Sequence, residues 1–259
     1  MIDFFKKFFE YANYDGVIRQ FEDNLGHGAY QDYRHFLWMV VTIILVIIVF
    51  KVFKTKQQFG YKVMMTASIG LFSVRFINQV MRAIIGAEVP ALRAFPFHLC
   101  TVMTFLLPIV IVFNIKKLKP AVFLLSMMGG IITILIGDYF DNKFMTFGML
   151  EGMTAHTLLI LIPCINMAIG GFKMTFKKSL TVFPAMMVLL LWATFANEVL
   201  FKAYDTNYMY LRRNGLPGNL GGNYYLLIYG AIFLLLYGLI VGLPYLFQYK
   251  KYQIAEKHA

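Results

Sequence analysis

Two histidines and a cysteine stand near the ends of otherwise apolar stretches of the chain. The segment AFPFHLCTVMTFLLPIV, residues 94–110, contains His98 and Cys100, and the later segment GMTAHTLLIL contains His156. A thiol activated by an imidazole is a nucleophile–base combination that attacks carbonyl carbons and forms covalent acyl intermediates. These residue types predict an activated cysteine nucleophile, provided that the fold brings them to one place.

The position of Cys100 favours a reactive thiol. We expect Pro96 in the first turn of a helix, which puts Cys100 within about a turn of the helix N-terminus, where partial positive charge favours a thiolate. Residues two apart in a regular helix point about 200° away from each other, so His98 and Cys100 are not expected to serve the same cavity unless the helix start is irregular. His156 is therefore the expected base for Cys100, and His98 the expected ligand of an oxyanion or a headgroup.

The second cysteine, Cys164, has a different expected role. It lies eight residues beyond His156, which in a helix is about 12 Å deeper in the membrane. This depth difference argues against a Cys100–Cys164 disulfide, and we expect Cys164 to pack as a small apolar side chain. The histidines also lack tight metal-ligand spacing such as H-x-x-x-H, so neither a metal nor another cofactor is expected.

The composition shows which elements must position these residues. Of the 259 residues, 59% are hydrophobic and 14% are charged, against roughly 45–50% and 25% in soluble domains. A hydrocarbon core about 30 Å thick needs about 20 apolar residues per helix. We predict an all-α, polytopic membrane protein, a bundle of seven transmembrane helices. The predicted spans are residues 36–54, 62–86, 96–114, 120–140, 152–171, 178–200 and 224–247.

Lysine positions predict how the bundle sits in the membrane. Lysines concentrate in the loops 51–62, 115–119 and 172–178 and in the C-terminal tail, which all lie on one side of the bundle. Since cytoplasmic loops carry excess Lys and Arg, the N-terminus is expected outside and the C-terminus in the cytoplasm. The net charge of +11 is explained by this bias toward the inner leaflet, so no nucleic-acid partner is expected.

The chain ends complete the predicted organisation. Residues 1–35 form an extracytoplasmic segment with an N-terminal amphipathic interfacial helix, because apolar residues recur there at helical spacing. Residues 36–247 form the transmembrane domain, and residues 248–259 form a basic cytoplasmic tail.

Ionisable side chains within the spans fall at the same end as the cysteine. Such residues are costly in a membrane and tend to face a protein interior or a wet cavity, so a single pocket in the outer third of the bundle is expected. Tyrosine and arginine in the last outer loop, FKAYDTNYMYLRRNGLPGNLGGNYY, suit headgroup contacts, and its Gly and Asn residues give tight turns. The candidate substrate-binding residues are Arg75, Arg82, Asp138, Glu198, Asn207, Tyr208 and Arg212.

Structural explanations compete with this interpretation. Arg75 or Arg82 can pair with Asp138 or Glu198 simply to lock helices together, or the charged ends can extend to the interface. The loop tyrosines are explained equally well by an aromatic belt.

The motif PFHLC, the isolated histidine in GMTAHTLLIL and the motif TNYMYL, in this order across seven spans, resemble the YwaF-type bacterial integral membrane family, which is similar to eukaryotic transmembrane protein 164. The resemblance implies a cysteine-dependent lipid acyltransferase in a bacterial cytoplasmic membrane. It makes Cys100 the nucleophile and His156 its base, with His98 and Asn207 in support. A more distant similarity to androgen-induced membrane hydrolases also implies acyl-ester chemistry.

The expected partners are membrane lipids. Acyl-CoA is cytosolic, so a nucleophile in the outer third is expected to take its acyl chain from an outer-leaflet phospholipid and pass it to a lipid or lipoprotein acceptor. Two alternatives remain: a non-enzymatic lipid or small-molecule carrier, in which breaks at Pro108, Pro163 and Pro184 permit rocking, and an intramembrane metal-dependent lipid hydrolase.

Overall fold

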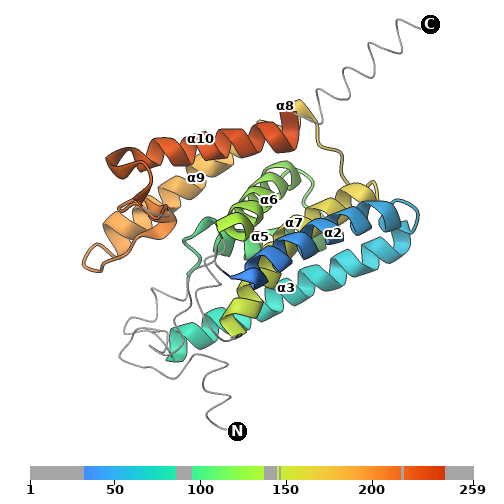
Figure 1. Ribbon diagram of the computed structural model, residues 1–259, viewed down its shortest axis with the longest axis horizontal. Helices are drawn as coiled ribbons and strands as arrows, with labels where there is room; N and C mark the ends of the chain where they lie inside the picture. The colour runs from blue at the N-terminus through green and yellow to red at the C-terminus, as the bar shows by residue number, and fades with distance from the viewer. Residues whose placement is uncertain (1–31, 86–94, 137–144, 146, 217–218, 243–259) are drawn as a thin grey trace, which may run out of the picture.

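The computed structural model describes residues 32–85, 95–136, 145, 147–216 and 219–242, with side chains described up to residue 80 in the first range. Every regular element within these ranges is helical (Figure 1). The prediction of an all-α polytopic membrane protein is therefore confirmed. The predicted interfacial helix near the N-terminus and the basic tail lie outside the described residues.

Apolar runs of membrane length fold as helices because a backbone in hydrocarbon must satisfy its own hydrogen bonds. The long helices are α2 (Tyr33–Phe53), α3 (Gln57–Ile85), α5 (Leu99–Val112), α6 (Lys119–Ile136), α7 (Phe147–Ala168), α9 (Val182–Phe195) and α10 (Tyr225–Tyr237). The shorter elements are α8 (Phe176–Ser179), η4 (Ala196–Leu200), η5 (Tyr208–Tyr210), η7 (Gly222–Tyr224) and η8 (Gly238–Gly242).

Six helical stretches in the described part of the chain are long and apolar enough to cross a membrane: 33–53, 57–80, 119–136, 147–168, 176–200 and 222–242. The remaining apolar helix, α5, has only 14 residues, fewer than the ~20 that span a bilayer. The crossing of the bilayer by α5 and the outward orientation of the N-terminus stay predictions.

Helices α6 and α7 form the centre of the bundle, because most of their residues are buried. Helices α2 and α3 pack on one side of this pair, with α5 also against α3 and α6. Helices α9 and α10 lie side by side next to α6 (Figure 1). Exposed leucines, isoleucines and valines cover much of α2, α9 and α10, as expected of surfaces that face lipid tails.

The interior prolines Pro108 and Pro163 do not produce the helix breaks that a rocking carrier would use, whereas the helix is interrupted at residues 180–181, between α8 and α9, just before Pro184. Helix α5 continues through Pro108 and α7 through Pro163. Pro184 lies in the first turn of α9, where its missing N–H has no intrahelical partner to lose. Both interior prolines are buried, so packing against neighbouring helices stabilises the continuous form.

Candidate functional site

A cavity of about 1200 Å³ opens between α5, α6, α7, α9, α10 and the segment 205–211. Its wall includes the predicted catalytic residues Cys100, His156 and His98. Three of the predicted substrate-binding residues, Arg75, Asn207 and Tyr208, line it as well. Side chains from distant parts of the sequence therefore meet at one cavity.

The chain enters α5 differently from the sequence-based expectation. The helix begins at Leu99, with His98 as an extended N-cap residue (φ −85°, ψ 145°), so Pro96 is not in the first turn. The indole Nε1 of Trp192 donates to the Pro96 carbonyl at 3.0 Å, and Phe97 is buried against the rings of Trp192 and Tyr208. These contacts hold residues 96–98 outside the helix.

This late start explains how His98 and Cys100 reach the same cavity. The expected separation of about 200° applies to two residues inside a regular helix, whereas His98 precedes the helix. Cys100 is the second residue of α5, and the His98 side chain does not cap the helix. Backbone N–H groups of the first turn have no intrahelical acceptor, so the Cys100 thiol lies beside such donors.

Close packing of α6 surrounds the thiol. Cys100 Sγ lies 3.6 Å from the Thr133 hydroxyl, within hydrogen-bonding distance for sulfur. A Cβ atom built on Gly129 would lie 3.1 Å from the same sulfur. Glycine at this position therefore allows α6 to approach the thiol while leaving space beside it.

The next residue of α6, Gly130, approaches the other candidate catalytic helix. A Cβ atom there would lie 2.7 Å from the His156 carbonyl oxygen. The imidazole Nδ1 of His156 lies 2.6 Å from the Gly152 carbonyl, and a carbonyl only accepts, so Nδ1 carries the proton and donates. In the neutral ring, Nε2 then holds the lone pair that a general base needs.

His98 adopts the opposite tautomer. Its Nδ1 accepts a hydrogen bond of 3.3 Å from the Met209 backbone N–H, so in the neutral ring Nε2 carries the proton. The rings of Tyr208 and Tyr210 pack at the imidazole, with centroids 5.5 and 5.7 Å away. The cavity thus has one imidazole suited to accept a proton and another suited to donate a hydrogen bond.

Arg75 connects three helices at the edge of the cavity. Its Nη1 donates to both carboxylate oxygens of Glu151 at 3.1 Å, and its Nη2 donates to the Thr101 hydroxyl at 3.3 Å. Asn78 also donates to Glu151 at 3.1 Å. The predicted pairing of Arg75 with Asp138 or Glu198 is wrong as regards Glu198, because Glu151 is the acidic partner and Glu198 pairs elsewhere.

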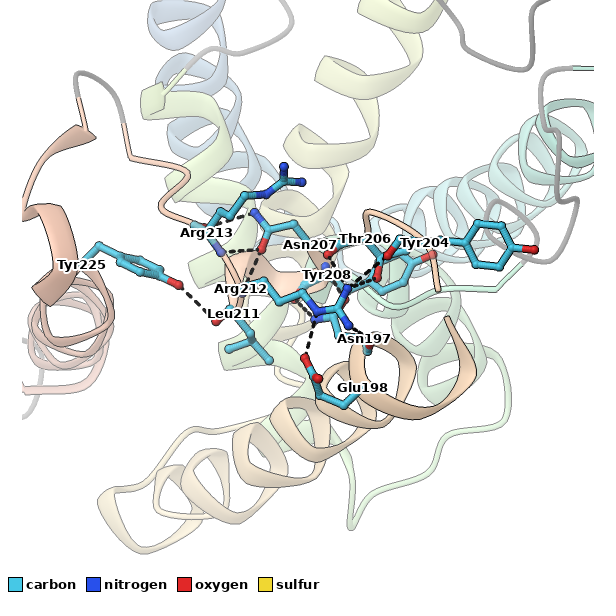
Figure 2. A network of polar contacts seen from close by, with 10 residues as sticks. All are labelled: Asn197, Glu198, Tyr204, Thr206, Asn207, Tyr208, Leu211, Arg212, Arg213 and Tyr225. Carbon is cyan, nitrogen blue, oxygen red and sulfur yellow. Dashed lines mark hydrogen bonds and ion pairs between the residues drawn. The ribbon is translucent and has the colours of Figure 1, made fainter. Parts of the chain in front are cut away.

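Arg212 forms a network that organises the segment 201–216 after η4 (Figure 2). Its guanidinium pairs with Glu198 at 2.8 Å and donates to the backbone oxygens of Asn197, Tyr204 and Thr206. Neither Arg212 nor Glu198 lines the cavity. Their side chains stabilise the segment, so their predicted contact with substrate has no geometric support here.

Two asparagines hold the same segment (Figure 2). Asn197 donates to the Tyr208 carbonyl at 3.1 Å and accepts from the Tyr208 N–H at 3.0 Å. The Asn207 side-chain oxygen accepts from the N–H groups of Arg212 and Arg213. Asn207 lines the cavity, but its side chain is engaged with its own segment.

The remaining predicted residues have these positions. Asp138 and the side chain of Arg82 lie outside the described residues. Both cysteines are free, and Cys164 is buried in the core. Among the residues that the structure describes, no group of three or more His, Cys, Asp or Glu side chains is placed to hold a metal ion.

Sequence reasoning missed Gly129 and Thr133, which surround the thiol, and Thr101, which binds Arg75. It also missed the role of Glu151. The adjacent glycines in the span 120–140 were a usable signal, because small residues mark close helix contacts in membranes. Thr133 lies one turn beyond Gly129 on the same helix face. No comparable signal pointed to the Met209 backbone.

A bundle of apolar helices around a cavity that contains ionisable side chains defines a polytopic membrane protein with an internal polar site. The chain belongs to the TMEM164 family, whose model matches residues 30–242 and so includes every helix described above. Comparison with curated proteins and with solved structures gave no match. The similarity to transmembrane protein 164 is thus confirmed, whereas the YwaF-type bacterial assignment stays a prediction.

Proposed function

We propose that this protein is a membrane-embedded lipid acyltransferase of a bacterial cytoplasmic membrane. It moves an acyl chain from an outer-leaflet phospholipid, through a thioester on Cys100, to a lipid or lipoprotein acceptor. The supporting observation is that Cys100 and His156, carried by α5 and α7, line one cavity.

The first half-reaction transfers the acyl chain to the protein. Nε2 of His156 takes the thiol proton, Cys100 Sγ attacks the ester carbonyl carbon, and the carbon–oxygen ester bond breaks. The departing lysolipid alkoxide receives the proton from His156, which leaves a thioester on Cys100. Without substrate, the Cys100 thiol contacts the Thr133 hydroxyl. In the proposed mechanism its hydrogen bond to His156 forms in the substrate complex, as is common for catalytic hydrogen bonds.

The second half-reaction regenerates the thiol. An acceptor hydroxyl or amine gives its proton to His156 and attacks the thioester carbonyl. The carbon–sulfur bond breaks, and the thiolate recovers the proton. With water in place of the acceptor, the same steps give a hydrolase.

In this mechanism, two groups stabilise the oxyanion of each tetrahedral intermediate. The first is the set of N–H groups in the first turn of α5, which begins at Leu99. The second is the Nε2–H of His98, whose tautomer is set by the bond from Met209. Donors fixed in a water-poor site stabilise developing charge strongly.

Arg75 is the candidate contact for the substrate's polar groups. It lines the cavity, and its buried Nε atom has no hydrogen-bond partner within the described structure. A phosphate or ester oxygen at this position would satisfy that donor. The proposed outer-leaflet location follows from the lysine distribution. Cys100 is the second residue of α5, and Arg75 and His156 lie in the halves of α3 and α7 that are further from the lysine-rich loops.

The test is acyl exchange between labelled phosphatidylcholine and a lysolipid in reconstituted vesicles. Cys100→Ala should abolish exchange, and Cys164→Ala, which changes a cysteine outside the cavity wall, should retain it. Thermal unfolding of both variants checks that they are folded. Exchange that is unchanged in Cys100→Ala would overturn the thioester mechanism.

The same vesicles separate the alternatives. Lipid movement between leaflets that persists in Cys100→Ala, without acyl exchange in any variant, would support a carrier. Loss of activity on chelation and its recovery on adding zinc would support a metal-dependent hydrolase instead.

A further inference from the structure

The cavity extends from Cys100 along an apolar groove between α9 and α10. The α9 side chains that line it recur at i, i+3, i+4 and i+7, and those of α10 follow the same helical spacing, so each set forms one stripe. The lining residues are Phe183, Met186, Met187 and Leu190 from α9 and Leu226, Tyr229, Gly230, Phe233 and Leu234 from α10. We call this stretch the α9–α10 groove.

The end of the groove distant from Cys100 is closed by aromatic rings. Phe183 packs against Phe233 with ring centroids 6.0 Å apart, and against Tyr237 at 5.1 Å. The hydroxyl groups of Tyr237 and Ser179 are hydrogen-bonded at 2.7 Å. At the other end of α10, the Tyr225 hydroxyl donates to the Leu211 carbonyl beside the catalytic end. The groove therefore has one end at the thiol and another at Phe183 and Phe233.

The dimensions suit a hydrocarbon chain. The lining residues span about 10 Å of α9 and about 12 Å of α10 at 1.5 Å per residue. The whole cavity, about 1200 Å³, exceeds the roughly 300–1000 Å³ of ordinary small-molecule pockets. Met187 is 56% exposed and Leu234 is 57% exposed, so the groove is open along its side to the surrounding bilayer.

Gly230 leaves room in this groove. A Cβ atom built there would meet no heavy atom within 4 Å, although the residue lies in the groove wall. Gly238, two turns further along, also has open space at its Cβ position but does not line the cavity. A side chain added at Gly230 would start in open space within the groove, whereas one added at Gly238 would start in open space outside the cavity.

We propose that the α9–α10 groove binds the fatty acyl chain of the donor phospholipid, which enters sideways from the bilayer, and that Phe183 and Phe233 limit its length. This inference rests on the proposed thioester chemistry, since it places the ester carbonyl at Cys100 and the end of the chain at the aromatic pair. No polar side chain is needed along the groove, because hydrocarbon is bound by burial alone.

The experiment measures which acyl chains are transferred. Vesicles containing phosphatidylcholines of mixed chain length are incubated with a labelled lysolipid, and the acylated product is resolved by mass spectrometry. Gly230→Leu should lower the ratio of long to short chains transferred by about tenfold or more, a typical discrimination for apolar pockets. Phe183→Ala should shift the ratio in the opposite direction, and Gly238→Leu should leave it unchanged.

The outcomes distinguish the two proposals. Equal transfer by the unaltered protein and by Cys100→Ala would overturn the thioester chemistry and, with it, this inference. Transfer that depends on Cys100 but has the same chain-length ratio in Gly230→Leu and Phe183→Ala as in the unaltered protein would overturn the groove alone. The two groove variants change volume in opposite directions, so misfolding of one leaves the other as the test.

Discussion

The guanidinium of Arg75 and the buried carboxylate of Glu151 form an ion pair between α3 and α7, with both carboxylate oxygens 3.1 Å from Nη1. The pair also reaches α5, because Nη2 of Arg75 donates to Thr101, the residue after Cys100. Glu151 lies five residues before His156 in α7. One arginine thus connects the two helices that carry the candidate catalytic pair.

Removing only the cation from this pair should be strongly destabilising. Arg75→Met leaves the Glu151 carboxylate buried without its ion partner, which costs about 3–5 kcal/mol. The double variant Arg75→Met with Glu151→Leu should be more stable than Arg75→Met alone, because no uncompensated charge remains. Thermal unfolding in lipid nanodiscs measures both variants. If the single and the double variant lose equal stability, the ion pair does not couple these helices.

Substitution of Gly129 should disturb the thiol directly. In Gly129→Ala the new methyl group would lie about 3.1 Å from Cys100 Sγ, so the sulfur must shift, and acyl transfer should fall on the order of tenfold. Gly70→Ala is the matched control, because a Cβ atom at Gly70 meets nothing within 4 Å. That variant should keep its activity and gain up to about 1 kcal/mol of helix stability. Equal activity of the two alanine variants would contradict the assigned position of the thiol.

The two hydrogen bonds between the Asn197 side chain and the Tyr208 backbone should hold the segment 201–216 in place. Asn197→Ala removes two hydrogen bonds and leaves the buried Tyr208 backbone groups without these partners, at about 1–3 kcal/mol each. We expect faster proteolysis within the segment and lower acyl transfer, because Met209, which fixes the His98 tautomer, is the next residue. Lys202→Ala, which alters an exposed side chain of the same segment, is the control and should be cut more slowly than Asn197→Ala.

His98 offers a test of oxyanion stabilisation. In His98→Asn the side-chain oxygen can still accept the Met209 N–H, whereas the Nε2–H donor is lost. The expected result is a fall in kcat of about 10²–10³-fold, the usual loss for one oxyanion donor, with little change in unfolding temperature. A rise in KM with an unchanged kcat would instead assign His98 to substrate binding.

Hydropathy and helical spacing were sufficient to predict the helices and the end of the bundle where the polar residues gather. The ends of α3, α5, α6 and α7 that lie opposite the lysine-rich loops are far apart in sequence but are expected to share a depth, and depth follows from the length of each span. The shared cavity of Cys100 and His156 could be anticipated for this reason.

The interaction partners of the polar side chains at that end of the bundle could not be predicted, because depth does not determine which helices are neighbours. Arg75 has Glu151 as its partner, and this depends on the packing of α3 against α7. The start of α5 depended on a tertiary hydrogen bond, from Trp192 to Pro96, which overrides the local preference of proline for a first turn. The role of Arg212 depended on the fold of a segment with little regular structure.

The open side of the α9–α10 groove also affects how the protein should be purified. Detergent alkyl tails are chemically equivalent to the proposed occupant, so they would compete with lipid for the space beside Gly230. Tail length should therefore change the apparent activity of solubilised protein, and short-tailed detergents or detergent-free extraction should preserve it best.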